Sequence, residues 1–249
     1  MNPVLRWFHQ LGSPPYFYAF ATRWMPWFGW SALVLTLIGM YIGLHRAPAD
    51  YLQGDSFRII YIHVPSAWMS MFIYVAMAVN GAIALIWRIK LSEILFLACA
   101  PIGAMFTAVT LITGMLWGKP TWGAYWVWDA RLTSELVLLF LYFGVIGLAS
   151  AYDDLRQGAR AAAVLALVGV VNVPIIHFSV KWWNTLHQGE TVRIMGKSSI
   201  DSSMLWPLLI MALATKLYFV FALLLRTRSA LAEQERGKQW VREAMVEAA

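Results

Sequence analysis

The chain has 249 residues, of which 60% are hydrophobic, 15% aromatic and only 13% charged. Soluble globular domains carry about 25% charged residues, so this composition excludes an ordinary soluble domain and indicates a membrane protein. The formal net charge of +6 does not indicate nucleic-acid binding, because the lysines and arginines are scattered over short connections and form no basic stripe.

Six apolar segments are long enough to cross a bilayer as helices, since about 20 helical residues span the roughly 30 Å hydrocarbon core. They lie at about residues 27–44, 61–87, 94–116, 133–152, 161–178 and 204–225. Lipid offers no partner for unpaired backbone groups, and the segments lack the two-residue alternation of a membrane β-barrel. We therefore expect an all-α membrane protein, a six-transmembrane-helix bundle that forms a single domain over residues 1–249.

The two ends of the chain and its cysteine give further expectations. The first 23 residues contain no uninterrupted apolar core before a cleavage site, so we expect the first spanning helix to act as the insertion signal. The only cysteine, Cys99, falls inside the third apolar segment, which leaves no intramolecular disulfide and no CxxC motif. The charged tail over residues 226–249 is predicted to be helical.

The first outer connection, from His45 to Arg58, leads into the sequence YIHVPSAW. In that sequence His63 stands just before Val64-Pro65, and proline is well placed in the first turn of a helix. This puts His63 at the outer mouth of the second span.

The second outer connection, residues 117–131, is rich in tryptophan. If Trp122–Asp129 is helical, Trp122, Tyr125, Trp126 and Asp129 share one face; if it is extended, Trp122, Trp126 and Trp128 do. The sequence leaves both conformations open. Glycines at 118 and 123 let a flat ligand approach the backbone. The structural alternatives are an interfacial aromatic belt, with Asp129 stabilising a helix start and Arg131 pairing with Glu135.

The third outer connection, residues 179–203, contains His187 in the sequence WWNTLHQGE, and His177 lies just before it, three residues after Pro174. Taken singly, each histidine is explained by a structural hydrogen bond. Two imidazoles beside a group of indoles on one face of the membrane also match haem, whose iron accepts imidazole nitrogen and whose macrocycle stacks on apolar rings. The haem propionates would then bind cations, for which Arg58, Lys119 and Arg131 are available.

The sequence WGAYWVWD, residues 122–129, resembles the WWD signature of the haem-handling protein superfamily, with every fixed position of W-G-x-x-W-x-W-D present. The segments RIIYIHVPSAWMSM, APIGAMFTAVTLITG and VVNVPIIHFSVKWWNTLHQG resemble the haem exporter protein C (CcmC) family of cytochrome c maturation system I. This resemblance covers most of the chain, and the tail after Arg226 is its least recognisable part.

The resemblance implies a protein of the bacterial inner membrane with both termini cytoplasmic and the WWD loop, residues 117–131, periplasmic. It implies that His63 and His187 are the axial ligands of haem b and that the protein is not an enzyme. The remaining haem-contacting residues would be Trp117, Trp122, Gly123, Tyr125, Trp126, Trp128 and Asp129, with Arg58, Lys119 and Arg131. The implied partners are the haem chaperone CcmE, the ATPase CcmA and the subunits CcmB and CcmD, besides membrane lipid.

Two other functions compete with haem delivery. An electron-transfer b-type cytochrome would keep its haem, but such proteins usually hold paired histidines within the spans. A transporter could use the tryptophans as a cage for a cationic solute, which leaves the histidines and the cationic loops unexplained. The sequence MGKSS at 195–199 does not make a phosphate-binding loop, because Thr191 replaces the first glycine and no strand precedes it.

Overall fold

The computed structural model describes residues 12–187 and 200–247, and these residues are almost entirely helical. The α-helices are α2 (Pro14–Tyr41), α3 (Ile60–Trp87), α4 (Lys90–Trp122), α5 (Ala130–Ser150), α6 (Leu155–Gly169), α7 (Asn172–Trp182), α8 (Ser202–Gln234) and α9 (Gln239–Glu247). A π-helical turn, η1 (Ile42–Arg46), and a 3₁₀ turn, η2 (Asp55–Ile59), connect α2 to α3. Within the described residues six helical stretches are long and apolar enough to cross a membrane, which confirms the predicted all-α fold and the number of spans.

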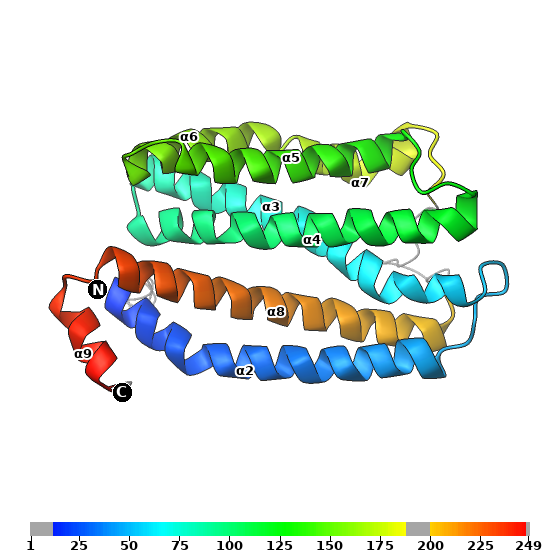
Figure 1. The fold of residues 1–249 in the computed structure, drawn as a ribbon, viewed down its shortest axis with the longest axis horizontal. Coiled ribbons are helices and arrows are strands. Elements are labelled where there is room, and N and C mark those ends of the chain that lie inside the picture. The colour runs from blue at the N-terminus through cyan, green and yellow to red at the C-terminus, as the bar shows by residue number, and fades with distance from the viewer. Residues whose placement is uncertain (1–11, 188–199, 248–249) are drawn as a thin grey trace, which may run out of the picture.

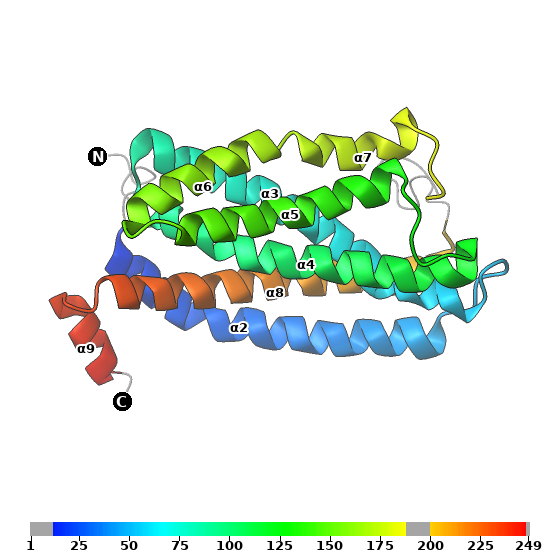
Figure 2. The same cartoon turned by 45° about the horizontal axis from the view of Figure 1, so that its top comes forward.

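The helices form layers whose long axes run in nearly the same direction (Figures 1 and 2). Helices α2 and α8, far apart in the sequence, pack side by side, and α8 packs in turn on α3 and α4. Helix α5 packs on α4, α6 and α7. One end of the bundle holds α9, the start of α2 and the α3–α4 and α5–α6 turns; we call it the terminal end. The other end holds the α2–α3 and α4–α5 connections and the end of α7; we call it the site end.

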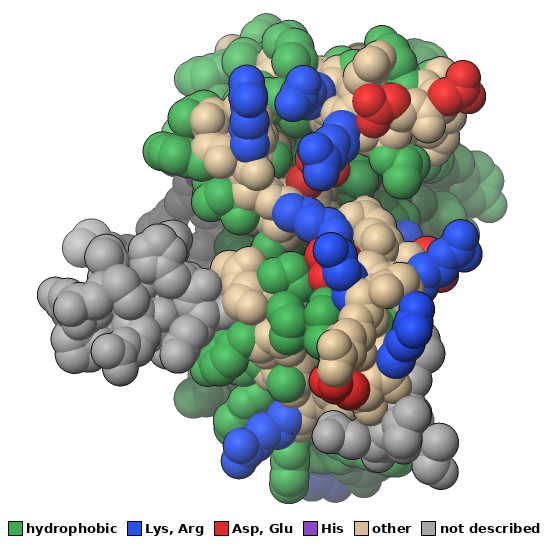
Figure 3. Space-filling model, turned by 90° about the vertical axis from the view of Figure 1, so that its left-hand side faces the viewer, with side chains coloured by type: hydrophobic (Ala, Val, Ile, Leu, Met, Phe, Trp, Pro, Cys, Tyr) green, Lys and Arg blue, Asp and Glu red, His purple; other side chains and the backbone are tan. Residues whose placement is uncertain are grey.

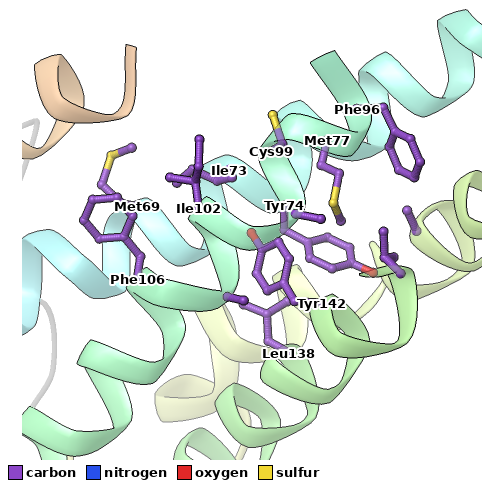
Figure 4. Packing of buried hydrophobic residues seen from close by; sticks show 14 of the residues in the cluster. Met69, Ile73, Tyr74, Met77, Phe96, Cys99, Ile102, Phe106, Leu138 and Tyr142 are labelled. Atoms are coloured by element: carbon purple, nitrogen blue, oxygen red, sulfur yellow. The ribbon is translucent and has the colours of Figure 1, made fainter. Parts of the chain in front are cut away.

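The main core lies between α3, α4, α5 and α6 (Figure 4). Tyr74 of α3 and Tyr142 of α5 meet edge to face there, with ring centroids 5.0 Å apart. The Tyr142 hydroxyl donates to the Ser70 carbonyl at 2.7 Å. Gly103 of α4 lies directly against the Tyr142 ring, where a Cβ atom would overlap it. The missing side chain therefore allows α4 and α5 to approach closely.

The fifth span is interrupted at Val170–Val171, between α6 and α7. Pro174 has no N–H to donate to the carbonyl four residues earlier, which belongs to Val170. The Val170 carbonyl instead accepts from the N–H of Val173 at 3.0 Å. The helical hydrogen bonding is therefore interrupted between α6 and α7, although Val170 and Val171 both keep right-handed helical backbone angles.

The helix ends differ from the predicted segments in two places that bear on the site. Helix α4 continues to Trp122, so Trp117 and Lys119 lie in its last turns and only residues 123–129 form a non-helical connection before α5. Hydropathy could not reveal this, because the last turns of α4 leave the apolar stretch. Helix α8 likewise continues past Arg226 to Gln234, so the first part of the tail extends a spanning helix.

Candidate functional site

His63 lies in the first turn of α3 at the site end, and its ring is held by α4. Its Nδ1 atom is 3.1 Å from the carbonyl oxygen of Thr110 and 3.0 Å from the hydroxyl of Thr113. A carbonyl can only accept, and the Thr113 hydroxyl already donates to the Val109 carbonyl at 2.6 Å. Nδ1 therefore carries the proton, and Nε2 keeps its lone pair for another ligand.

The surroundings of His63 are shaped to hold its ring in one orientation. A Cβ atom on Gly114 would come within 3.1 Å of the His63 Cε1 atom, so the glycine leaves just enough space for the imidazole. Trp117 meets His63 edge to face, with centroids 5.6 Å apart. The Trp117 indole is fixed in turn, because its Nε1 donates to the Gln53 side chain at 2.7 Å.

His187 is positioned by a carboxylate. Its Nδ1 is 3.1 Å from Oδ2 of Asp129, and the two side chains are 16% and 6% exposed respectively. Burial raises the pKa of Asp129, but hydrogen bonds from His187 and from the Leu132 N–H outweigh burial and lower it below its ordinary value. An ionised carboxylate only accepts, so Nδ1 of His187 is the donor, and its Nε2 has no hydrogen-bond partner among the described residues. The ring also meets Trp122 edge to face at 4.9 Å between centroids.

The two imidazoles, His63 in α3 and His187 after α7, are therefore held by the same kind of hydrogen bond. Each uses Nδ1 to donate to a protein oxygen, an arrangement that orients histidine for metal binding through Nε2. The charges of the two rings would interact with each other and with Arg131, so all three groups share one region of the site end.

The connection between α4 and α5 is not helical over residues 123–129, which excludes the helical one of the two conformations that the sequence left open. Gly123 ends α4 with φ of 80°, a left-handed conformation that glycine adopts without strain, and the following residues are irregular. Trp126 and Trp128 contact each other with centroids 5.4 Å apart, while Trp128 is 76% exposed. The buried Nε1 of Trp126 has no hydrogen-bond partner among the described residues.

The predicted propionate-binding cations lie in different environments. Lys119 donates to the Gly123 carbonyl at 3.1 Å and lies over the exposed Tyr125 ring, 5.4 Å from its centroid. Arg131 interacts electrostatically with Asp129 and with Glu135. It lies in the first turn of α5, beside the histidine site.

Arg58 already has structural partners. Its Nη1 donates to the carbonyl oxygens of Gly43 and Ala47 at 2.8 and 2.9 Å, and its Nε pairs with Asp55 at 2.9 Å. These bonds tie η1 to η2. A haem contact by Arg58 stays a prediction.

Two groups of functional residues were missed by the sequence reasoning. Thr110, Thr113 and Gly114, which hold His63, stand within the apolar sequence TAVTLITG, where threonines at three-residue spacing were the only signal. Glu135 interacts electrostatically with Arg131, as the sequence suggested, but it also accepts from the Ser70 hydroxyl at 2.7 Å and is 5% exposed. Both contacts join different helices, which local sequence patterns do not report.

Together these features define a polytopic helical membrane protein. At one end of its bundle, two imidazoles lie among indole rings, and each is held through Nδ1 by a protein oxygen. Residues 7–242 match the family described as Heme exporter protein C. The chain is 50% identical over 238 residues to Heme exporter protein C of Escherichia coli K12, covering 96% of each chain. It is 46% identical over 237 residues to that of Haemophilus influenzae, covering 95% of this chain and 96% of the relative.

A third relative, Heme exporter protein C of Bradyrhizobium diazoefficiens, is 51% identical over 211 residues, which cover 85% of this chain and 80% of the relative. The chain belongs to the Heme exporter protein C family. This confirms the family resemblance that the WWD signature indicated.

Proposed function

We propose that the chain binds haem b at the site end and delivers it to the haem chaperone CcmE during c-type cytochrome biogenesis. The observation that carries this proposal is the matched state of His63 and His187. In both, Nδ1 donates to a protein oxygen, which leaves Nε2 as the ring nitrogen that would bind iron. Membership of the Heme exporter protein C family supports haem as the cargo.

The residues at the site end fit haem chemically. Haem iron would take an imidazole Nε2 on each face. Trp117 and Trp122, which contact the two histidines, would cover apolar porphyrin surface and exclude water. The unpartnered Nε1 of Trp126 and the cations Lys119 and Arg131 would supply donors for the propionates.

The location follows from the same proposal. We infer that the chain lies in the bacterial inner membrane with the site end in the periplasm and the terminal end in the cytoplasm. CcmA, CcmB and CcmD would complete the complex, and ATP hydrolysis would belong to CcmA. The sequence MGKSS at 195–199 lies outside the described residues, as do all of residues 188–199 of the third outer connection.

The proposal is tested with His63→Ala and His187→Ala in the purified full chain. Each variant should change the absorption spectrum of bound haem and lower the haem retained per protein. His177→Ala is the matched control, because His177 is an exposed histidine whose ring contacts Phe178 and not the site. Spectra unchanged in both site variants would refute axial ligation.

Delivery is tested separately by incubating the haem-loaded chain with purified CcmE and assaying haem bound covalently to CcmE. We expect transfer from the wild type and loss of transfer from His187→Ala. Haem that stays on the chain through repeated reduction and oxidation, with none reaching CcmE, would favour the b-type electron-transfer alternative.

A further inference from the structure

The terminal end, opposite the histidine site, contains a cavity of about 590 Å³. The α3–α4 turn, the start of α6 and the end of α8 meet around it. Its cationic lining residues are Arg88, Lys90, Arg156 and Arg160. Figure 3 shows this face of the molecule, with lysine and arginine side chains spread across it and fewer acidic side chains between them.

The arginine side chains of this cavity have hydrogen-bond donors without partners among the described residues. The side chains of Arg88, Arg156 and Arg160 are exposed and donate no hydrogen bond to any residue that the structure describes. Lys90 differs, because its Nζ donates to Glu235 at 2.7 Å. The cavity therefore presents several guanidinium groups to an incoming acceptor.

Three carboxylates, Glu93, Asp153 and Asp154, line the same cavity and equal its arginines in number, while Lys90 is paired with Glu235. Asp154 is used locally, since its Oδ1 accepts from the Arg156 N–H at 2.8 Å and begins α6. Glu93 interacts with Arg156, Arg160 and Lys90 together, so it is shared among three cations. The hydrogen-bond donors that stay without a partner among the described residues belong to the arginines, and guanidinium groups suit the oxygens of an anionic group.

The backbone at Arg88 gives a second observation. Arg88 follows the last residue of α3 with φ of 55° and ψ of 35°, and it is the one non-glycine residue with positive φ in the described part of the chain. Glycine is the usual residue at this position, because a side chain is strained there. An arginine in this conformation is consistent with a role for its side chain at the cavity.

An apolar groove of about 360 Å³ adjoins the cavity, and Gln234 lines both. It runs between the first turns of α4 and the last turns of α8, along residues that include Ile94, Leu97, Ala98 and Leu225. These turns belong to spanning helices, so the groove continues from the charged end toward the apolar part of the bundle. Arg226 is the one charged residue among the described residues that line the groove.

We propose that the cavity and the groove together bind one anionic phospholipid. The phosphate and headgroup accept from Arg88, Arg156 and Arg160, and one acyl chain lies along the groove. Basic pockets between spanning helices at the membrane surface bind anionic headgroups in this way. A free phosphate would occupy only the cavity, and neither concavity has the aromatic rings and histidines of the haem site.

The experiment measures the lipid that stays with the protein. The full chain is incorporated into vesicles of equal parts phosphatidylglycerol and phosphatidylcholine and extracted in detergent, and the retained lipid is quantified by mass spectrometry. We expect phosphatidylglycerol to be enriched over phosphatidylcholine. The double variant R156A/R160A should lower its retention by about 5-fold for each cation removed. Arg236→Ala is the matched control, because Arg236 is about 80% exposed and lines neither concavity.

A second variant separates a whole lipid from its headgroup. Ala230 also lines the groove. The variant Ala230→Phe fills the groove and should lower phosphatidylglycerol retention. Inorganic phosphate, which lacks an acyl chain, should displace little of the lipid. If A230F fails to give the wild-type circular dichroism spectrum, Ala230→Leu replaces it. Retention unaffected by the groove variant but abolished by inorganic phosphate would leave an anion site alone and overturn the lipid proposal.

Two further outcomes would also overturn it. One is equal retention of the two lipids by the wild type. The other is unchanged lipid in R156A/R160A together with loss of a co-purifying protein, which would make this surface a protein contact. None of these results depends on haem binding, so the lipid proposal can fail while the proposed function stands.

Discussion

Asp129 binds His187 and begins α5 with separate oxygens of one carboxylate. Its Oδ2 accepts from Nδ1 of His187 at 3.1 Å, and its Oδ1 accepts from the Leu132 N–H at 2.8 Å. One carboxylate therefore begins the helix and fixes the His187 ring at the same time. The consequence is that the segment carrying His187 is fixed to the first turn of a spanning helix.

Substitutions at Asp129 should separate these two roles. Asn can still begin the helix, so Asp129→Asn should change the free energy of unfolding by no more than about 0.5 kcal/mol. Loss of the carboxylate that orients His187 should weaken haem binding about 10- to 100-fold, measured by haem titration. Asp129→Ala should also lose about 0.5–2 kcal/mol of stability.

Asp154→Asn is the control for Asp129, because Asp154 begins α6 through its side chain and contacts no histidine. It should leave haem binding unchanged. Equal haem affinity in Asp129→Asn and the wild type would show that the carboxylate does not orient the ligand.

Gly114→Ala should disturb His63 without disturbing the fold. The new Cβ would come within 3.1 Å of the imidazole Cε1, so the ring must shift by a few tenths of an ångström. We expect a shifted haem absorption spectrum and weaker retention. Gly147→Ala is the control, because Gly147 lies in α5 with nothing within 4 Å of its added Cβ. That change should raise helix stability by about 0.5–1 kcal/mol and leave the haem spectrum alone.

Ser70→Ala should loosen the contact between α3 and α5. The buried bond from the Ser70 hydroxyl to Glu135 would be lost, and such bonds between spanning helices contribute about 0.6–1.7 kcal/mol. Unfolding in detergent should report a loss in that range. Ser150→Ala provides the comparison, since the exposed Ser150 hydroxyl donates only within its own helix. A loss no larger than that of Ser150→Ala would mean that Glu135 finds another donor.

The attachment of α9 should depend on pH through Glu235. Burial raises the pKa of Glu235, but hydrogen bonds from Lys90 and from the Trp240 indole outweigh burial and lower it below its ordinary value. Because the folded pKa is depressed, its stabilising effect is present above the ordinary glutamate pKa and is lost as pH falls through the folded pKa. Hydrogen exchange of α9 should therefore accelerate on acidification in that range.

Glu235→Gln tests the assignment of this pH dependence. The variant should exchange rapidly at neutral pH and show no further acceleration in the range where the wild type responds. An unchanged pH profile in Glu235→Gln would assign the dependence to another group.

The all-α fold and the number of spans were predicted correctly, because both follow from the composition of long stretches of the chain. Apolar stretches predicted six spanning segments, because a bilayer requires a continuous apolar run. The interruption of the fifth segment at Val170–Val171 was not predicted. The end of α4 was placed too early, because its last turns carry polar residues and glycine. The oxygens that hold His63 and Glu135 come from other helices, so no local pattern could predict them. The choice of His187 over His177 came from the family resemblance and not from spacing.

The turn at Val170–Val171 divides the fifth span into two helices, α6 and α7. Helix α6 is anchored against α3 and α5, whereas α7 packs chiefly on α5 and leads directly into the segment of His187. Tilting α7 about this joint would move one imidazole relative to the other while the far half of the span stayed in place. If the proposed function holds, haem could then be released from His187 while His63 on α3 still held it.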